Sequence, residues 1–224
     1  MKQKPTKKSS HSIPLTPLST QQSQYIKSIQ ENIVTIGLGY AGSGKTYIAA
    51  TLAAQFKIDN KKYGSIILCR PNISDSRTIG YLKGDMDEKM APWVIPYMDV
   101  LKKHLGGHLE EYVANETVQV VPMEYIQGRT WDNSFVLLDE AQHTTPKEME
   151  MFLKRVGQDS TIIITGDLNQ AVRGKTSGLN QIMEMTDEQQ ALSNHIGVVH
   201  FNDLNGIVRS DFCRAVTKAY SEVK

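Results

Sequence analysis

The sequence predicts an α/β fold, a parallel sheet with helices on both faces, and three observations support it. Short apolar runs rich in Ile, Val and Leu alternate with longer segments whose apolar residues recur at helical spacing. One apolar run leads into a glycine-rich loop at residues 39–46, and a helical segment follows the loop directly. Another apolar run ends in two acidic residues. Strands buried between helix layers are continuously apolar, as these runs are.

Composition limits the domain organisation and the compartment. The 224 residues carry a net charge of +1 and suffice for one α/β domain, but not for two nucleotide-binding lobes. With so little net charge, any contact with nucleic acid must be local. The two cysteines suggest no disulfide framework and no apolar run is long enough to span a bilayer, so we expect a cytoplasmic protein without a membrane partner.

The chain divides into a tail and a folded domain. Residues 1–17 are basic and polar, and we expect a flexible tail there, with a loose contact to phosphate backbones as the alternative. Residues 18–224 are expected to form the domain. It begins with a helix at residues 21–29, followed by a buried strand at residues 33–38.

The loop after this strand has the pattern G-x-x-x-x-G-K-T and precedes a helix at residues 47–56. Glycines let backbone amides turn toward an anion, and the start of the helix adds partial positive charge. An ordinary glycine turn is the alternative, which the flanking strand and helix disfavour. The loop therefore predicts a nucleotide site in which Lys45 reaches the β- and γ-phosphates and Thr46 binds Mg²⁺. The residues expected to bind nucleotide are Gly39, Ala41, Gly42, Ser43, Gly44, Lys45 and Thr46.

The next elements are two strands with a long connection between them. Residues 64–70 predict a buried strand, and residues 117–121 a further one. In the connection, residues 72–93 are polar and are expected to be irregular, whereas residues 96–104 predict a helix. Two glycines at 106–107 should break that helix.

An apolar run at residues 134–138 predicts a fourth strand, which delivers Asp139 and Glu140 at its carboxyl end. In a P-loop site, Asp139 would hold Mg²⁺ through water and Glu140 would orient and polarise the attacking water. A surface acidic turn is the alternative. It is disfavoured because a well-marked helix follows, with Thr145 and Glu148 placed to form a capping box.

The remaining elements complete the sheet. Residues 161–165 predict a fifth strand, and a polar cluster follows at residues 166–170, where open α/β sheets bind ligands. Within it, Gln170 is placed to hydrogen-bond the γ-phosphate. Residues 198–201 predict the last strand and residues 210–220 the last helix. The apolar side of that helix consists of Phe212, Val216 and Ala219.

Together these motifs resemble the PhoH-like family, the phosphate-starvation-inducible P-loop ATPases related to superfamily 1 helicases. The resemblance covers the chain from about Leu18 onward. It implies a RecA-type core with strand order 5-1-4-3-2, ATP hydrolysis and a role with nucleic acid. It also places Gln22 at the adenine-reading position and Gln170 at the γ-phosphate sensor. Besides the glycine loop, the motifs that carry it are Arg70-Pro71, Gly84-Asp85, Glu88-Lys89, Pro92, 128–130, 138–142, 166–170, 177–179 and Val208-Arg209.

The chain departs from the family pattern in a few places. Tyr40, Lys83 and His143 stand where the family usually has Pro, Pro and Asn. The loop between Gln170 and Arg173 is also shorter than usual. None of these changes touches the triphosphate chemistry directly, but the shorter loop leaves the role of Arg173 open.

The first functional hypothesis is Mg²⁺-dependent ATP hydrolysis coupled to binding of, or movement along, RNA or single-stranded DNA. Lys83, Lys89 and Arg129 are the candidate contacts to nucleic acid. The alternative is an ATP-dependent switch or assembly protein that acts on a protein partner without nucleic acid. A small-molecule kinase is disfavoured, because Glu140 beside Asp139 suits activation of water.

The sequence also suggests a homo-oligomer. Superfamily 1 helicases place ATP between two RecA-like lobes, and the second lobe supplies an arginine to the γ-phosphate. This chain has one P-loop and is too short for a second lobe, so another copy is the simplest arginine donor. Head-to-tail contacts that close make a ring, and RecA-type cores commonly form hexamers. Arg209 is the expected donor, with Arg214 and Arg173 as alternatives.

Overall fold

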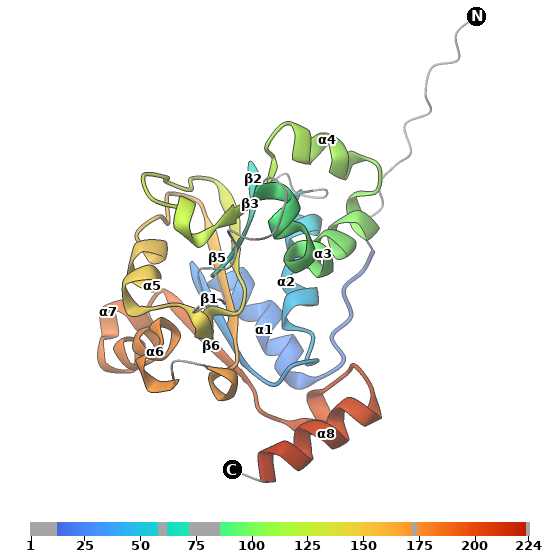
Figure 1. Ribbon diagram of the computed structural model, residues 1–224, viewed down its shortest axis with the longest axis vertical. Helices are drawn as coiled ribbons and strands as arrows, with labels where there is room; N and C mark the ends of the chain where they lie inside the picture. Colours follow the sequence, from blue (N-terminus) through green and yellow to red (C-terminus); the bar gives the residue numbers. More distant parts are fainter. Residues whose placement is uncertain (1–12, 58–61, 72–85, 172–173, 223–224) are drawn as a thin grey trace, which may run out of the picture.

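A computed structural model describes residues 13–57, 62–71, 86–171 and 174–222 (Figure 1). Within these ranges, residues 86–93, 175 and 222 are described by their backbone alone. One six-stranded sheet forms the centre of the molecule, in the order β3-β2-β4-β5-β1-β6. All its strand pairs are parallel. The strands are β1 (Val34–Gly39), β2 (Ser65–Arg70), β3 (Val118–Pro122), β4 (Ser134–Leu138), β5 (Thr161–Gly166) and β6 (Ile196–Phe201).

The strand order confirms the predicted core and adds one strand to it. Without β3, the order β6-β1-β5-β4-β2 becomes 5-1-4-3-2 when the five strands are numbered along the chain. β3 pairs with β2 at the edge of the sheet, so the five-strand order was incomplete. The position of a strand in a sheet depends on its partners, which its own residues do not reveal.

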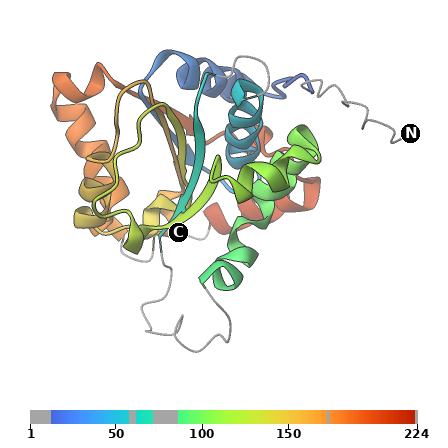
Figure 2. The ribbon, with the colours of Figure 1, turned by 90° about the horizontal axis from the view of Figure 1, so that it is seen from above.

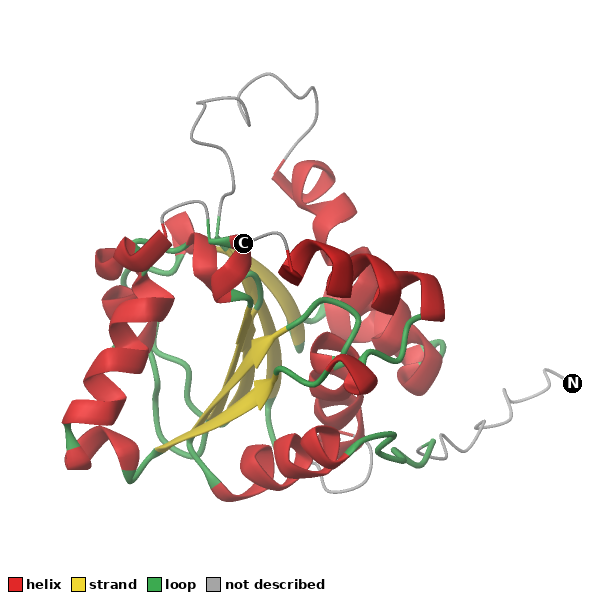
Figure 3. Cartoon of the chain, turned by 90° about the horizontal axis from the view of Figure 1, so that it is seen from below, coloured by secondary structure: helices red, strands yellow, loops and turns green. Residues whose placement is uncertain are grey.

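Helices cover both faces of the sheet (Figures 2 and 3). Helices α1 to α4 pack on one face and α5 to α7 on the other. Alternate residues of each strand point to opposite faces. In β2, Ile66 and Leu68 accordingly join the first core cluster, while Ile67 and Cys69 join the second. The helices are α1 (Thr20–Glu31), α2 (Lys45–Gln55), α3 (Met86–Leu105), α4 (His108–Ala114), α5 (Pro146–Leu153), α6 (Gly178–Glu188), α7 (Gln190–Ser193) and α8 (Asp211–Glu222).

Helix α3 is longer than the sequence predicts. It begins at Met86, so residues 86–93, expected to be irregular, are helical. Two prolines lie inside it, at 92 and 96, and a proline within a helix removes a backbone hydrogen bond. Burial outweighs that cost, because Tyr97, Leu101 and Leu105 recur at four-residue spacing and are at most 3% exposed. The break at the two glycines is confirmed, since α4 begins directly after them.

The sequence also predicts how α5 begins and which side of α8 is apolar. The capping box of α5 is confirmed: Thr145 Oγ1 accepts from the Glu148 amide at 3.2 Å, and the Glu148 carboxylate accepts from the Thr145 amide at 2.7 Å. The predicted apolar side of α8 is not covered by the described part of the chain. Phe212 is 79% exposed and Val216 39% exposed.

No helix among the described residues has the length and apolarity needed to cross a bilayer.

Candidate nucleotide site

A cavity of about 510 Å³ lies at the carboxyl ends of β1, β4 and β5. The crossovers of a parallel sheet leave this edge open, and loops with polar side chains converge there. Ten of the predicted site residues line it: Gly39, Ala41, Gly42, Gly44, Lys45, Thr46, Asp139, Glu140, Gln170 and Arg209. The remaining two do not line it: Ser43 is a buried residue of the loop, and Gln22 is a buried residue of α1 that contacts it.

The glycine loop connects β1 to α2 through backbone conformations that favour glycine. Gly39 has φ +123°, and a Cβ added there would lie 2.2 Å from the Phe201 carbonyl oxygen. Gly44 has φ +88° and immediately precedes α2. The turn therefore holds the amino end of α2 toward the cavity, where its free amides and partial positive charge suit a phosphate.

Lys45 is the first residue of α2, and its side chain turns back over the loop. Its Nζ donates to the Gly39 carbonyl at 2.7 Å, the Tyr40 carbonyl at 2.8 Å and the Ser43 hydroxyl at 3.2 Å. Burial lowers the pKa of Lys45, while the negative charges of Asp167, Asp139 and Glu140 act in the opposite direction. The ammonium group is thus partly desolvated and lies close to the carboxylates of the site.

Asp139 and Thr46 provide the oxygen atoms expected to bind Mg²⁺. Asp139 follows β4, and its carboxylate accepts a hydrogen bond from the Thr165 hydroxyl at the end of β5. Both Asp139 and Thr46 line the cavity. Hydroxyl and carboxylate oxygens are hard ligands, and Mg²⁺ takes one or two of them together with waters and substrate phosphates. The donor set therefore fits this ion, with Asp139 and Thr46 as the residues that would hold it.

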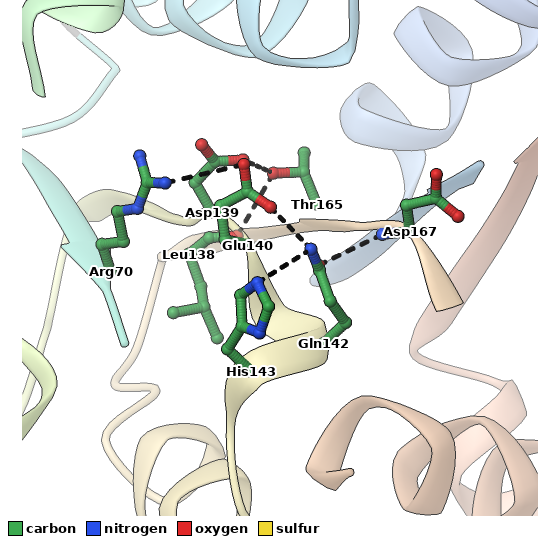
Figure 4. A network of polar contacts seen from close by, with 8 residues as sticks. All are labelled: Arg70, Leu138, Asp139, Glu140, Gln142, His143, Thr165 and Asp167. Atoms are coloured by element: carbon green, nitrogen blue, oxygen red, sulfur yellow. Dashed lines mark hydrogen bonds and ion pairs between the residues drawn. The ribbon is translucent and has the colours of Figure 1, made fainter. Parts of the chain in front are cut away.

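Glu140 is held in a defined position by two neighbours (Figure 4). Arg70 Nη2, from the end of β2, lies 3.6 Å from Glu140 Oε1, and Gln142 Nε2 donates to Glu140 Oε2 at 2.6 Å. The Glu140 backbone is in the left-handed region, with φ +54°. A residue other than glycine rarely adopts this conformation, which is typical of functional sites whose surroundings impose it.

Gln142 connects the ends of β4 and β5. Its amide is fully buried, donates to Glu140 and accepts from the Asp167 backbone amide at 3.1 Å (Figure 4). Gly166 permits this approach, since a Cβ there would lie 2.8 Å from Gln142 Oε1. Residue-by-residue reasoning assigned no role to Arg70, Gln142 or Thr165. Arg70 and Gln142 did occur within motifs of the family resemblance, which was the one signal available for them.

Gln170 lies at the cavity, where a γ-phosphate sensor is expected. Its Nε2 donates to Asp167 Oδ2 at 2.9 Å, and the Asn169 amide donates to Asp167 Oδ1 at 3.0 Å. Asp167 itself is only 7% exposed. The carboxylate of Asp167 therefore orients the amide of Gln170, and the sensor role of Gln170 stays a prediction.

Gln22 and Ser43 form hydrogen bonds that stabilise the glycine loop. Gln22 is 4% exposed, and its Nε2 donates to the Ser43 carbonyl at 3.0 Å while its Oε1 accepts from the Leu18 amide at 2.8 Å. Ser43 is also buried, and its hydroxyl donates to the Tyr40 carbonyl. Both the Oε1 and the Nε2 of Gln22 thus have partners within the chain. Its adenine-reading role stays a prediction, and it requires that Gln22 replace these hydrogen bonds with bonds to adenine.

Arg209 lies beside the glycine loop of its own chain. The adjacent Val208 amide donates to the Gly42 carbonyl at 3.1 Å, and a Cβ added to Gly42 would lie 3.2 Å from Arg209 Cβ. Arg209 lines the cavity and is exposed. This geometry offers a contribution within one chain, which the sequence argument for a donor in another copy did not consider.

The other predicted basic residues are less close to the cavity. Arg214 pairs with Asp211 at 3.2 Å and donates to the Ile207 carbonyl. Arg129 is exposed, donates to Gln119 Oε1 at 3.0 Å and does not line the cavity. Two more of the predicted basic residues, Lys83 and Arg173, lie outside the described residues. For Lys89 only the backbone is described. Most of the predicted tail, residues 1–12, also lies outside the described residues.

Fold and site together define a P-loop NTPase with a RecA-like core. The family model described as PhoH-like protein matches residues 14–221. The chain therefore belongs to the PhoH-like family, as its motifs suggested.

Curated relatives agree with this assignment. Protein PhoH of Escherichia coli (strain K12) is 37% identical over 213 residues, which cover 93% of this chain and 58% of the relative. The PhoH-like protein of Bacillus subtilis (strain 168) is 36% identical over 204 residues, which cover 90% of this chain and 62% of the relative. The chain thus spans less than two thirds of the length of these curated relatives.

Solved structures with the same fold include two large terminases. The enzyme of bacteriophage HK97 has a TM-score of 0.58 at 13% identity, over 93% of this chain and 48% of that chain. The second enzyme, from a thermophilic bacteriophage, has a TM-score of 0.58 at 12% identity, over 93% of this chain and 51% of that chain. At this identity the likeness establishes the fold alone.

Proposed function

We propose that this chain hydrolyses ATP with Mg²⁺ and couples the hydrolysis to binding of, or movement along, RNA or single-stranded DNA. The observation that carries the ATPase part is the convergence of Lys45, Asp139 and Glu140 in one cavity, at the carboxyl ends of β1 and β4. A cation from the glycine loop, a metal-binding carboxylate and a second carboxylate are the groups that hydrolysis of a triphosphate needs.

In the proposed reaction, water attacks the γ-phosphorus while the bond from that phosphorus to the bridging oxygen of ADP breaks. Glu140 orients this water and accepts its proton, and Arg70 and Gln142 hold the carboxylate in place. Lys45 exchanges its bonds with the loop carbonyls for the β- and γ-phosphate oxygens. Gln170 hydrogen-bonds the γ-phosphate. Thr46 and Asp139 would hold Mg²⁺, which would supply positive charge to the phosphates.

Replacing Glu140 by Gln is expected to leave Mg-ATP binding intact and to lower turnover at least ~10²-fold, the usual scale for a positioned base. Glutamine retains the size of the side chain but cannot accept the proton. Asp139→Asn is expected instead to remove the Mg²⁺ dependence of nucleotide binding. Phosphate release and titration of a fluorescent ATP analogue, with and without Mg²⁺, measure both effects.

Glu150, an exposed glutamate of α5 that pairs with Lys154, provides the matched control, and Glu150→Gln should behave as the wild type. If the Glu140 and Asp139 variants lose binding and turnover in the same way, the proposed division of roles is wrong.

Coupling to nucleic acid is expected to appear as stimulation of the ATPase. RNA or single-stranded DNA should raise turnover, and the increase should fall steeply with added salt, because contacts to phosphates release counterions. Arg129→Ala should reduce the stimulation without changing basal turnover. Lys27→Ala is the control, since its side chain is 72% exposed on α1 beside Glu31. Phosphate release measured across a salt series tests both points.

The alternative is an ATP-dependent switch or assembly protein that acts on a protein partner. The exposed side of α8 favours it, since Phe212 is 79% exposed and Tyr220 75% exposed on one short helix. Exposed aromatic groups gathered in this way are typical of protein contacts. The absence of stimulation by any RNA or single-stranded DNA at low salt would support this alternative.

We further propose that six copies assemble head to tail into a ring. In such a ring a neighbouring copy would enclose the nucleotide site of each P-loop domain, and repeated rotation about an axis closes such contacts. The exposed side of α8 directly follows Arg209, so one surface could bring both an apolar contact and an arginine to a neighbouring site.

A further inference from the structure

Helix α3 places a buried phenol at the wall of the nucleotide cavity. Tyr97 is 3% exposed, and Pro96 and Val100 on the same helix line the cavity. The ring of Tyr97 belongs to the core cluster between α3, α2 and the sheet. None of the roles proposed for the residues of the site involves this side chain.

The hydroxyl group of Tyr97 is what makes the position unusual. Within the described part of the chain it has no hydrogen-bond partner of normal geometry. Burial raises the pKa of Tyr97, and the nearby Asp139 carboxylate raises it further, while Thr46 and Arg70 act in the opposite direction. The hydroxyl therefore lies close to Asp139 and Thr46, the two residues expected to hold Mg²⁺. Burying a hydroxyl without a partner is unfavourable, and phenylalanine would fill the same space without that cost. A tyrosine here therefore indicates that the hydroxyl serves the polar site it faces.

We propose that Tyr97 is a positioning residue for the divalent cation of the nucleotide site. Its hydroxyl donates toward the Asp139 carboxylate and restrains the oxygens of Asp139 and Thr46 from the side of α3. Mg²⁺ demands near-ideal geometry, and groups that orient its ligands commonly change metal affinity when they are replaced. This inference rests on the proposed function, since it concerns the cation of the same site.

The test compares Tyr97→Phe with a matched variant at the other end of the sheet. Tyr63 is also buried, at 2% exposed, and its hydroxyl bonds that of Thr161 at 2.7 Å. Tyr63 and Thr161 lie where β2 and β5 begin, away from the cavity at the carboxyl ends. Tyr63→Phe therefore removes a buried hydroxyl without touching the site.

Two binding measurements and one stability measurement are made on each protein. Mn²⁺, which substitutes for Mg²⁺, is titrated by electron paramagnetic resonance in the presence of a non-hydrolysable ATP analogue. A fluorescent ATP analogue is titrated in EDTA, and the melting temperature is recorded. For Tyr97→Phe we expect Mn²⁺ affinity to fall about 10-fold, with metal-free nucleotide affinity unchanged and the melting temperature not lowered. Tyr63→Phe should retain wild-type Mn²⁺ affinity and melt at a lower temperature.

Unchanged Mn²⁺ affinity in a folded Tyr97→Phe protein would overturn the inference and leave Tyr97 as a core residue. An equal loss of metal-free and metal-dependent nucleotide binding would also overturn it, because the hydroxyl would then act on the loop. If the wild type binds neither Mn²⁺ nor nucleotide, the proposed function fails before any variant is compared, and the inference fails with it.

Discussion

Lys45→Ala is expected to abolish ATP hydrolysis and to weaken nucleotide binding. Lys45, Arg70 and Arg209 are the positively charged residues that line the cavity in the described part of the chain, and Lys45 alone comes from the glycine loop. Removing its ammonium group takes away a positive charge that interacts with the carboxylates of Asp167, Asp139 and Glu140. A triphosphate would then enter a site with net negative charge, which opposes both binding and the reaction.

The matched control is Lys57→Ala. Lys57 Nζ also donates to backbone carbonyls, those of Tyr63 at 3.3 Å and Gly64 at 2.8 Å, but just ahead of β2, where the sheet has its amino ends. Its removal should cost some stability and leave turnover near the wild-type value. Phosphate release and nucleotide titration, together with a melting curve, separate the two variants. Near-normal turnover in Lys45→Ala would exclude this loop as the phosphate site.

Arg209→Ala is expected to lower turnover about 10³-fold or more while ATP binding stays nearly intact, as removal of an arginine finger does. The bond from the Val208 amide to the Gly42 carbonyl holds this segment against the loop, and Arg209 lines the cavity in which the phosphates are proposed to bind. Arg214→Ala is the comparison. Arg214 is already engaged by Asp211 and the Ile207 carbonyl, and its loss should have a smaller effect.

Mixing subunits decides which site the arginine serves. In the proposed ring, Arg209→Ala subunits supply intact P-loops and Lys45→Ala subunits supply intact arginines, so the mixture should recover part of the activity. If Arg209 instead serves the cavity of its own chain, which it lines, the mixture stays inactive. That result in rings shown to contain both subunits, or a catalytically active monomer in sedimentation, would contradict a contribution from the neighbouring copy.

The features that could be predicted from the sequence are those that depend on residues close together in the chain. The glycine loop followed by a helix, the acidic pair after an apolar strand and the capping box of α5 are each local patterns with one favourable geometry. The residues of these patterns could therefore be assigned from their spacing alone. Parallel strands bring their carboxyl ends to one edge, so the meeting of Lys45 and Asp139 there followed as well.

Contacts between distant segments, in contrast, could be seen only once the chain was folded. The ion pair of Arg70 with Glu140 and the edge position of β3 join elements far apart in the chain. So does the approach of Tyr97 to Asp139 and Thr46, the residues proposed to hold Mg²⁺. For Gln22, the sequence suggested an adenine contact, yet packing of α1 against the loop engages its amide with Ser43 and Leu18. Such partners are chosen by how helices pack on the sheet, which depends on the whole core and not on the spacing of neighbouring residues.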